Sequence, residues 1–399
     1  MKILLCNKNY YHCGGVETLF LSTEKLLAEY GHTVIPFGLK SPENYESEYL
    51  KYFPSRPGKR LLKTLDSFYS IKSASALQRV IEKIKPDIAH IHNINGGLTF
   101  SILPVLKKNK IPIVATIHGF KYLCPVWEFY NRKHGVCEKC AGGKYYNCIL
   151  YNCSARGLFR SILLAVDGYF RDAFLNFRKY FDYFLFVSFF TRKKFLNIFP
   201  EIENRADVLY NFTDNIENRI TKPSKKNFLY VGRIEYAKGT DVLVEAFGEM
   251  GRLKLEIAGE GSLYILLKNS AKSNVKFLGR IGRGEIREKI IQSYFVIIAS
   301  RVYENNPYAV IEAFASGRPV IAPDAGGIPE IVENGKNGFL YKANDINALT
   351  DSIYKAYALE EREYEKMCER ALQTAKNKFN RTFHYEKLIS VYEKILKAN

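Results

Sequence analysis

The strongest constraint on this chain is the alternation of strand-like and helix-like segments along almost all of its 399 residues. Short apolar, β-branched runs such as residues 1–6 and 295–303 are typical of strands buried in a parallel sheet. Between such runs lie helical stretches such as residues 16–31, which ends in a glycine of the kind that terminates helices. This alternation predicts an α/β fold in which parallel sheets are covered by helices on both faces.

The chain is too long for one ordinary hydrophobic core, because single cores rarely grow beyond about 250–300 residues. The alternation is interrupted at residues 212–226, a polar and charged stretch that contains a proline. We therefore predict two doubly wound, Rossmann-like domains. The predicted boundaries are 1–213 for the first domain, with a cysteine-rich insertion at 121–153, 214–380 for the second, and 381–399 for a last helix that packs back on the first.

The chain is strongly basic, with a formal net charge of +18. Such an excess favours polyanionic partners: nucleic acid, anionic lipid or phosphorylated ligands. Residues 51–72 hold six basic residues against one acid, and residues 156–194 hold eight against three, interleaved with twelve Phe and Tyr. Basic, aromatic, amphipathic segments are typical of proteins that bind an anionic membrane surface. A solvated helix with its aromatic side chains in the core is an equal alternative for this pattern.

The sequence favours a cytoplasmic protein. No apolar stretch approaches the roughly 18–20 uncharged residues that cross a bilayer. The N-terminal apolar run is too short for a signal peptide and is better explained as a first strand. Together with the basic, aromatic segments, this predicts a cytoplasmic protein that binds peripherally at the inner face of the cell membrane.

Two carboxylates, Glu304 and Glu312, stand eight positions apart across a predicted strand-to-helix junction. Pro307 suits the first helical turn, where its missing N–H costs nothing, and we expect Glu312 about two turns into that helix. Ligands bind at the carboxyl ends of parallel strands, and a helix start attracts anions. Carboxylates on both sides of an anion site suit a ligand with hydroxyls at both ends of a phosphate group, such as a nucleotide sugar.

The second predicted domain begins with a possible pyrophosphate grip. Gly232 and Arg233 end its first strand, and Lys238 and Gly239 precede the next helix. Two cations beside glycines that let the backbone approach closely suit a diphosphate. Cations on loops are most often merely solvated, so this pattern gains weight only in combination with the two glutamates.

In these features the chain resembles the retaining glycosyltransferases of family 4. The resemblance spans nearly the whole chain and implies the GT-B fold, two Rossmann-like domains that face each other across a cleft. Its motifs are Gly14-Gly15 after the first strand, His118 at the end of the fourth, and residues 232–239, 258–261, 304–312 and 326–340.

The resemblance also implies roles for individual residues. Arg233 and Lys238 hold the donor diphosphate, Glu312 takes the ribose hydroxyls, and Glu304 contacts the donor sugar. His118 faces that sugar from the first domain. The resemblance further implies that catalysis uses no metal and no clear enzymic nucleophile. Fixed cations stabilise the charge that develops on a departing nucleoside diphosphate, as a divalent ion does elsewhere. The remaining implied donor contacts are the Gly14-Gly15 loop, Gly232, and the backbone around Asn306, Pro307 and Tyr308.

The chain departs from the family pattern at two places. Gly119 replaces the usual aspartate after the histidine, and Asn305-Asn306 replaces a commoner Pro-Phe pair. His90 and His92 alternate along one predicted strand and so share a face. His92 lies nearer the carboxyl end of that strand, although a structural role for it is favoured over a role in the site.

The insertion carries a cysteine pattern that is typical of a structural zinc site. Disulfides are disfavoured in a cytoplasmic protein, and unlinked thiols are the other alternative. The candidate ligands are Cys137, Cys140, Cys148 and Cys153, with Cys124 upstream.

These observations predict a hexosyltransferase that moves sugar from a nucleotide-diphosphate donor to a growing, lipid-linked, cell-surface glycan. A transferase of the same fold with a soluble small-molecule acceptor is the alternative among enzymes. Outside enzymes, the charge and the cysteine pattern would suit a nucleic-acid-binding protein. No nucleic-acid partner is expected, because that function would leave the second domain's charged motifs unexplained.

Overall fold

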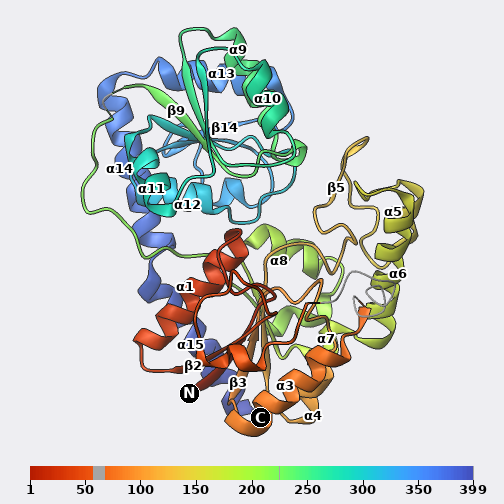
Figure 1. Ribbon diagram of the computed structural model, residues 1–399. Coiled ribbons are helices and arrows are strands. Elements are labelled where there is room, and N and C mark those ends of the chain that lie inside the picture. The colour runs from red at the N-terminus through yellow and green to blue at the C-terminus, as the bar shows by residue number, and fades with distance from the viewer. Residues whose placement is uncertain (57–67, 224, 399) are drawn as a thin grey trace. The chain divides into compact units, whose positions relative to one another are not determined.

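The computed structural model describes residues 1–56, 68–223 and 225–398 of the chain (Figure 1). The chain forms two compact units, each built on a six-stranded parallel sheet, which confirms the predicted α/β fold. The first unit comprises Met1–Glu128, Glu138–Leu209 and Arg381–Asn399, and the second comprises Phe129–Cys137 and Tyr210–Asn380.

The sheet of the first unit has the strand order β2-β1-β3-β4-β7-β8, with every neighbouring pair parallel. The order reverses next to β1, since β2 lies on one side of β1 and β3 on the other. Ligands of doubly wound folds bind at such a reversal. The strands are β1 (Lys2–Cys6), β2 (Thr33–Phe37), β3 (Ile88–Ile91), β4 (Ile113–Ile117), β7 (Tyr183–Phe186) and β8 (Ala206–Val208).

Three helices of this unit, α3, α7 and α8, begin at a residue whose side chain caps them. The hydroxyl of Ser70, for example, accepts the Ser73 N–H at the start of α3. The last helix, α15, belongs to this unit, and its buried Leu388 and Tyr392 pack in one cluster with Ile3 of β1. The helices are α1 (Gly15–Glu29), η1 (Glu48–Tyr52), α3 (Ile71–Ile84), α4 (Ile102–Lys108), α5 (Tyr146–Leu150), α6 (Leu158–Phe174), α7 (Phe177–Tyr180), α8 (Phe189–Leu196), η2 (Pro200–Arg205) and α15 (Arg381–Ala398).

The sheet of the second unit has the strand order β11-β10-β9-β12-β13-β14, again parallel throughout. Here the order reverses next to β9, which pairs with both β10 and β12. The strands are β9 (Asn227–Val231), β10 (Lys254–Ala258), β11 (Val275–Gly279), β12 (Phe295–Ile297), β13 (Val320–Pro323) and β14 (Gly338–Tyr341).

Two hydrophobic cores flank this second sheet, because successive side chains of a strand point to opposite faces. Phe228 and Tyr230 of β9 belong to one core, whereas Leu229 between them belongs to the other. Helices cover both faces: η3 (Tyr236–Lys238), α9 (Thr240–Glu249), α10 (Tyr264–Ser270), α11 (Arg283–Gln292), α12 (Tyr308–Ala315), η4 (Ile328–Glu330), α13 (Ile346–Tyr357) and α14 (Glu361–Lys378).

The insertion between β4 and α6 is divided between the two units. Its short antiparallel hairpin of β5 (Tyr130–Asn131) and β6 (Gly135–Val136) counts with the second unit, and α5 counts with the first. The boundaries predicted from the sequence assigned the whole insertion to the first domain. A single cut in the sequence cannot assign this hairpin correctly, because it counts with residues 210–380, which come much later in the chain.

Candidate functional site

Lys238 and Glu304 form an ion pair in the second unit. Lys238 ends η3, the turn after β9, and Glu304 lies on the loop after β12. Because β9 and β12 are neighbours in the sheet, the two loops meet, and Lys238 Nζ lies 2.5 Å from Glu304 Oε1. Their side chains are only 22% and 16% exposed. Strand order thus joins two predicted site residues that stand far apart in the sequence.

Glu304 is held as a carboxylate. Burial alone would raise its pKa, but Lys238, the Ser300 hydroxyl and Arg233 together outweigh burial and hold the pKa of Glu304 below its usual value. Lys238 and Ser300 both donate to Oε1. None of the residues that the structure describes donates to Oε2, so this oxygen can accept a hydrogen bond from a ligand.

The position of Lys238 depends on Gly239, which has φ of +65° and ends the 3₁₀ turn. Glycine adopts this left-handed conformation without strain. A Cβ at this position would also collide with the carbonyl oxygen of Ala299, which follows β12. Only glycine therefore lets the turn that carries Lys238 approach the loop that carries Glu304.

Arg301 locks the same turn from the side of β12. Its guanidinium makes two hydrogen bonds, of 2.6 and 2.8 Å, to the carboxylate of Asp241 in the first turn of α9, and a third, of 2.7 Å, to the Tyr236 carbonyl. Its backbone N–H donates to the Ala237 carbonyl. Sequence reasoning missed Arg301 and Asp241. The available signal was an arginine that interrupts the apolar run before Glu304.

Arg233 lies near Glu304, since it contributes to the low pKa of that carboxyl. Its own side chain is 58% exposed and pairs with Glu235 at 2.9 Å. Gly232 beside it donates its N–H to the Ala258 carbonyl of β10. An exposed guanidinium on a short loop keeps the freedom to turn toward an anion at the strand ends.

The predicted loop residues after Glu304 fix the loop through their side chains. Asn306 Oδ1 accepts the Asn211 N–H at 2.7 Å, and the Asn306 carbonyl accepts a hydrogen bond from Asn211 Nδ2 at 2.9 Å. The Tyr308 hydroxyl donates to the Phe212 carbonyl. Pro307 is the residue immediately before α12. The segment at the start of the second unit therefore holds this loop.

Glu312 is the fifth residue of α12, so it lies in the second turn of that helix. Burial raises the pKa of Glu312, and Arg283 at the start of α11 offsets this only in part. The Arg283 Nη2 atom lies 3.6 Å from Glu312 Oε1. A half-paired, buried carboxylate of this kind gains stability from hydroxyl donors of a ligand.

In the first unit, the predicted glycine loop is held by a buried carboxylate. Gly14 precedes α1 in an extended conformation, and Gly15 begins the helix. Glu17, in the first turn, is buried and accepts hydrogen bonds from Asn9 Nδ2 at 3.1 Å and Asn7 Nδ2 at 3.5 Å. Both asparagines follow β1. Sequence reasoning had not singled out this cluster.

His118 directly follows β4 and is a neutral imidazole, since burial lowers its pKa to about 3. His92 Nδ1 lies 3.0 Å from His118 Nε2, and the two rings stack with centroids 5.2 Å apart. His90 packs against the other side of His92, so the three rings form a histidine row. His90 contacts Thr116 through Nε2 and the Tyr392 hydroxyl through Nδ1. His92 therefore fixes one face of the His118 ring, which suits the structural role favoured for it.

Three of the four predicted zinc ligands, Cys140, Cys148 and Cys153, lie near one another and near Cys124. Hydrogen bonding to Cys153, followed by burial and the nearby Cys140 and Cys124, raises the pKa of the Cys148 thiol. Cys137 is absent from this group and counts with the second unit's hairpin. Among the residues that the structure describes, no group of three or more His, Cys, Asp or Glu side chains is placed to hold a metal. The zinc site stays a prediction.

A pair of doubly wound sheets, one of which carries a cation–carboxylate pair where its strand order reverses, defines a glycosyltransferase of the GT-B class. The family model described as Glycosyltransferase Family 4 matches residues 13–215, and the model described as Glycosyl transferases group 1 matches residues 212–378. The chain belongs to this family of glycosyltransferases, which confirms the resemblance inferred from its motifs.

Relatives of known sequence and structure agree with this assignment. The chain is 24% identical over 406 residues to an uncharacterized glycosyltransferase of Methanocaldococcus jannaschii, with 99% of each chain covered. It is 23% identical over 381 residues to an uncharacterized 42.6 kDa protein in the cps region of Klebsiella pneumoniae, covering 88% of this chain and 92% of that protein. The crystal structure of Anabaena HepE in complex with UDP-glucose shares the fold, with a TM-score of 0.67 at 16% identity, covering 99% of this chain and 100% of that one.

Replacing Arg301 should destabilise the second unit. Arg301→Lys keeps the charge but loses the planar fork that holds Asp241 and the Tyr236 carbonyl, at a cost of about 1.5–3 kcal/mol for hydrogen bonds to charged groups. Chemical denaturation monitored by circular dichroism measures this. Arg287→Lys is the matched control, because Arg287 pairs with Glu217 at the surface and such pairs contribute about 0–1 kcal/mol. Equal effects of the two changes would contradict the assigned role of Arg301.

Metal analysis tests the zinc prediction. Protein purified without a metal-affinity column should hold about one zinc per chain if a tetrahedral thiolate site forms. Cys140→Ser should then lower the zinc content, because Cys140 is one of the four predicted ligands. Cys368→Ser should leave it unchanged, because Cys368 lies in the core of the second unit. Metal-free, folded protein with freely titratable thiols would contradict the prediction.

Proposed function

We propose that this chain is a retaining transferase that moves a hexose from a nucleoside-diphosphate sugar to a growing, lipid-linked glycan. The observation that carries this proposal is the Lys238–Glu304 pair at the strand reversal of the second unit, with Arg233 beside it. Cations at that edge suit a diphosphate, and a carboxylate with one unused oxygen suits sugar hydroxyls.

The leaving diphosphate is the group whose charge must be stabilised. An ammonium has three donors, so Lys238 can keep its bond to Glu304 and still donate to phosphate oxygens. The Arg233 side chain is exposed, so it can break its ion pair with Glu235 and bind the diphosphate together with Lys238. These two cations supply charge that a divalent ion supplies in other transferases. Stabilisation grows as the glycosidic C–O bond breaks, because the oxygen charge grows with it.

The two glutamates hold opposite ends of the proposed donor. Glu304 accepts from a sugar hydroxyl through Oε2, while its Oε1 remains bound to Lys238 and Ser300. Glu312, whose pKa is raised by burial, is stabilised in its charged form when ribose hydroxyls donate to it. The family resemblance implies that His118 faces the donor sugar, and its neutral imidazole can donate or accept a hydrogen bond there.

The relatives support the donor and acceptor classes in this proposal. The crystal structure of Anabaena HepE contains UDP-glucose, and the Klebsiella relative is described as a protein in the cps region. Retention of configuration follows from the family resemblance. A soluble acceptor remains the alternative. A test of membrane binding distinguishes it from a lipid-linked acceptor.

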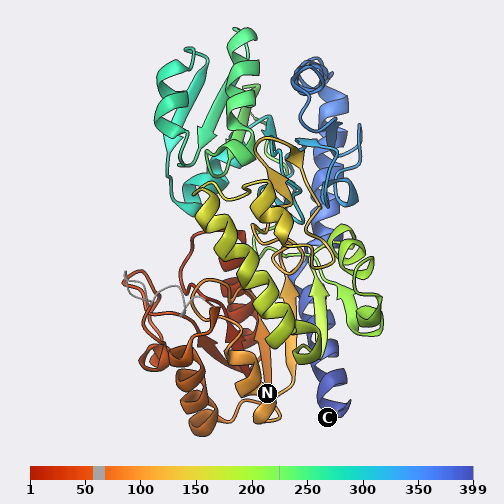
Figure 2. The same ribbon diagram turned by 90° about the vertical axis from the view of Figure 1, so that its right-hand side faces the viewer.

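Helix α6 supports a membrane-bound acceptor. Its buried face packs into the first unit, whereas Phe159, Ile162, Val166 and Tyr169 are exposed at a spacing of three or four residues, which places them in one stripe. Phe159 is 73% exposed. Figure 2 shows α6 running along the outside of its unit, toward the viewer. Apolar helical faces of this kind insert at the boundary between headgroups and acyl chains.

Basic residues accompany the apolar stripe. Arg156 and Arg160 lie at the start of α6, and neither is buried. Each basic residue near an anionic surface contributes about 1 kcal/mol. Lys59, Arg60 and Lys63 of the other basic stretch lie outside the described residues. No helix in the part of the chain that the structure describes is long and apolar enough to cross a bilayer.

Substitution of the two glutamates should separate binding from turnover. Glu312→Ala should mainly raise the donor KM, because it removes an acceptor for ribose hydroxyls. Glu304→Ala should mainly lower kcat by about 10²–10³-fold, because it removes the group that orients the sugar and Lys238. Steady-state kinetics with UDP-glucose as the first donor tested gives both parameters. Small, equal effects from the two changes would remove both residues from the proposed donor site.

Sedimentation with lipid vesicles tests the membrane assignment. Wild-type protein should bind vesicles that contain anionic lipid at low salt and bind neutral vesicles weakly. Phe159→Ser combined with Ile162→Ser should weaken binding by about tenfold or more, since each side chain loses apolar burial. Ile71→Ser is the control, because Ile71 of α3 is 70% exposed but lies outside α6. Binding that is absent, or equal for both lipid types, would favour a soluble acceptor.

A further inference from the structure

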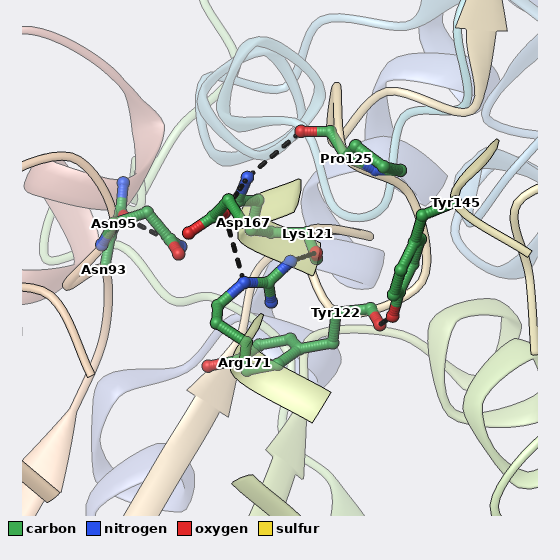
Figure 3. Close-up of polar contacts among 8 residues, drawn as sticks. All are labelled: Asn93, Asn95, Lys121, Tyr122, Pro125, Tyr145, Asp167 and Arg171. Atoms are coloured by element: carbon green, nitrogen blue, oxygen red, sulfur yellow. Dashed lines mark hydrogen bonds and ion pairs between the residues drawn. The ribbon is translucent and has the colours of Figure 1, made fainter. Parts of the chain in front are cut away.

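A cluster of three charged side chains lies in the first unit, outside the glycine loop and the histidine row. Lys121 follows β4, and Asp167 and Arg171 lie one turn apart on α6 (Figure 3). Lys121 Nζ lies 3.1 Å from Asp167 Oδ2, and Arg171 Nε lies 3.2 Å from the same oxygen. Two cations therefore share one carboxylate oxygen.

The cluster has more positive than negative charge at hydrogen-bond distance. Arg171 is 2% exposed, and its Nη1 makes no hydrogen bond with any residue that the structure describes. Nη2 donates to the Lys121 carbonyl at 3.3 Å. The next carboxylate on α6, Asp172, accepts a hydrogen bond from Tyr145 and interacts electrostatically with Arg171 without a direct hydrogen bond to it. A buried guanidinium with an unused donor is costly, which indicates a missing anionic partner.

The remaining polar contacts of Lys121 leave room for such a partner. Its ammonium donates to the Pro125 carbonyl at 3.1 Å and to Asp167, which uses two of its three donors. The Lys121 side chain is partly exposed, so the cluster is open to solvent although Arg171 is not. Burial and the nearby Arg171 lower the pKa of Lys121 to about 8, against the opposing effect of Asp167. An added anion would reverse that shift.

The cluster lies at the edge of the sheet where a ligand is expected. Asn93 and Asn95 follow β3, and Lys121 follows β4, so all three come from the carboxyl ends of adjacent parallel strands. Figure 3 shows the two asparagines on one side of the Lys121–Asp167 pair and Tyr145 on the other. Asn95 Nδ2 donates to Asn93 Oδ1 at 3.3 Å.

We propose that Lys121 and Arg171 form an oxyanion subsite that binds a phosphate or carboxylate group of the acceptor. This assignment rests on the proposed function for the identity of the ligand, since the first unit is the acceptor side in the resembling family. The phosphate would come from a diphosphate link to lipid, and the carboxylate from an acidic sugar. In either case the oxyanion accepts from the third donor of Lys121, and it reaches Arg171 Nη1 after a side-chain movement, because that atom is buried in the unliganded protein.

The only tryptophan of the chain provides a direct readout of this subsite. Trp127 is about half exposed, and its ring centroid lies 5.8 Å from Lys121 Nζ. Binding of an anion to Lys121 should therefore change tryptophan fluorescence in the whole protein without any transfer reaction. Inorganic phosphate and methyl glucuronide are the two probes, titrated at constant ionic strength with sodium chloride as the reference salt.

Three substitutions change the expected affinity for the probes, two by lowering it and one by raising it. Lys121→Gln and Arg171→Gln should weaken probe binding by about tenfold or more, because each loses a charge-assisted hydrogen bond. Asp167→Asn should tighten it, because the competing carboxylate charge is gone. Lys107→Gln is the matched control, since Lys107 pairs with Asp182 at the surface of the same unit. Circular dichroism checks folding, and if Arg171→Gln is unfolded, the more exposed Lys121→Gln decides.

Each outcome supports or overturns the subsite. Saturable binding of phosphate alone indicates a phosphate-linked acceptor, and binding of glucuronide alone indicates an acidic sugar. A fluorescence change that chloride reproduces, no change with either probe, or unaltered binding in Lys121→Gln would overturn the proposal. Lys238→Ala should keep the fluorescence response, because Lys238 belongs to the second unit. A failure of the proposed transferase function would therefore be distinguishable from a failure of the subsite.

Discussion

The Lys238–Glu304 ion pair is the interaction on which the second unit's site depends. Two oppositely charged, largely buried groups stabilise each other only when their separation is fixed, because each alone would be costly to bury. The surrounding structure supplies that fixation. Gly239 lets the two loops approach closely, and Arg301 ties the Lys238 turn to Asp241. The result is a carboxylate whose free oxygen and a cation whose free donors point to the same strand edge.

The first unit arranges its polar residues by the same rule. Glu17 is satisfied by Asn7 and Asn9, and His118 is held by His92. Asn7 and Asn9 follow β1, whereas His92 and His118 follow the neighbouring strands β3 and β4. Arg171 Nη1 and His92 Nε2 are both buried atoms without a hydrogen-bond partner among the described residues. Arg171 carries a charge, so its unused donor is the costlier of the two to bury, and this makes its cluster the candidate ligand site.

Sequence reasoning reached the fold and the principal motif residues because both depend on local signals. Hydrophobic runs and helix ends identified the two sheets, and the spacing of Glu304 and Glu312 identified a strand-to-helix junction. Reasoning of this kind missed Arg301 with Asp241 and Lys121 with Arg171, whose members are 60 and 50 positions apart. Such partnerships have no local pattern. The predicted zinc ligands Cys137, Cys140, Cys148 and Cys153 stay a prediction.

By itself, the sequence determined which segments become strands, where their loops lie, and which loops carry charge, because these properties follow from side-chain periodicity and turn chemistry along the chain. Only the tertiary structure decided which loops meet. β9 and β12 are neighbours although β10 and β11 separate them in the sequence, and this order brings Lys238 to Glu304. The physical reason is that sheet hydrogen bonds and the two cores on either side select strand neighbours by packing, whereas distance along the chain imposes only a modest entropic cost.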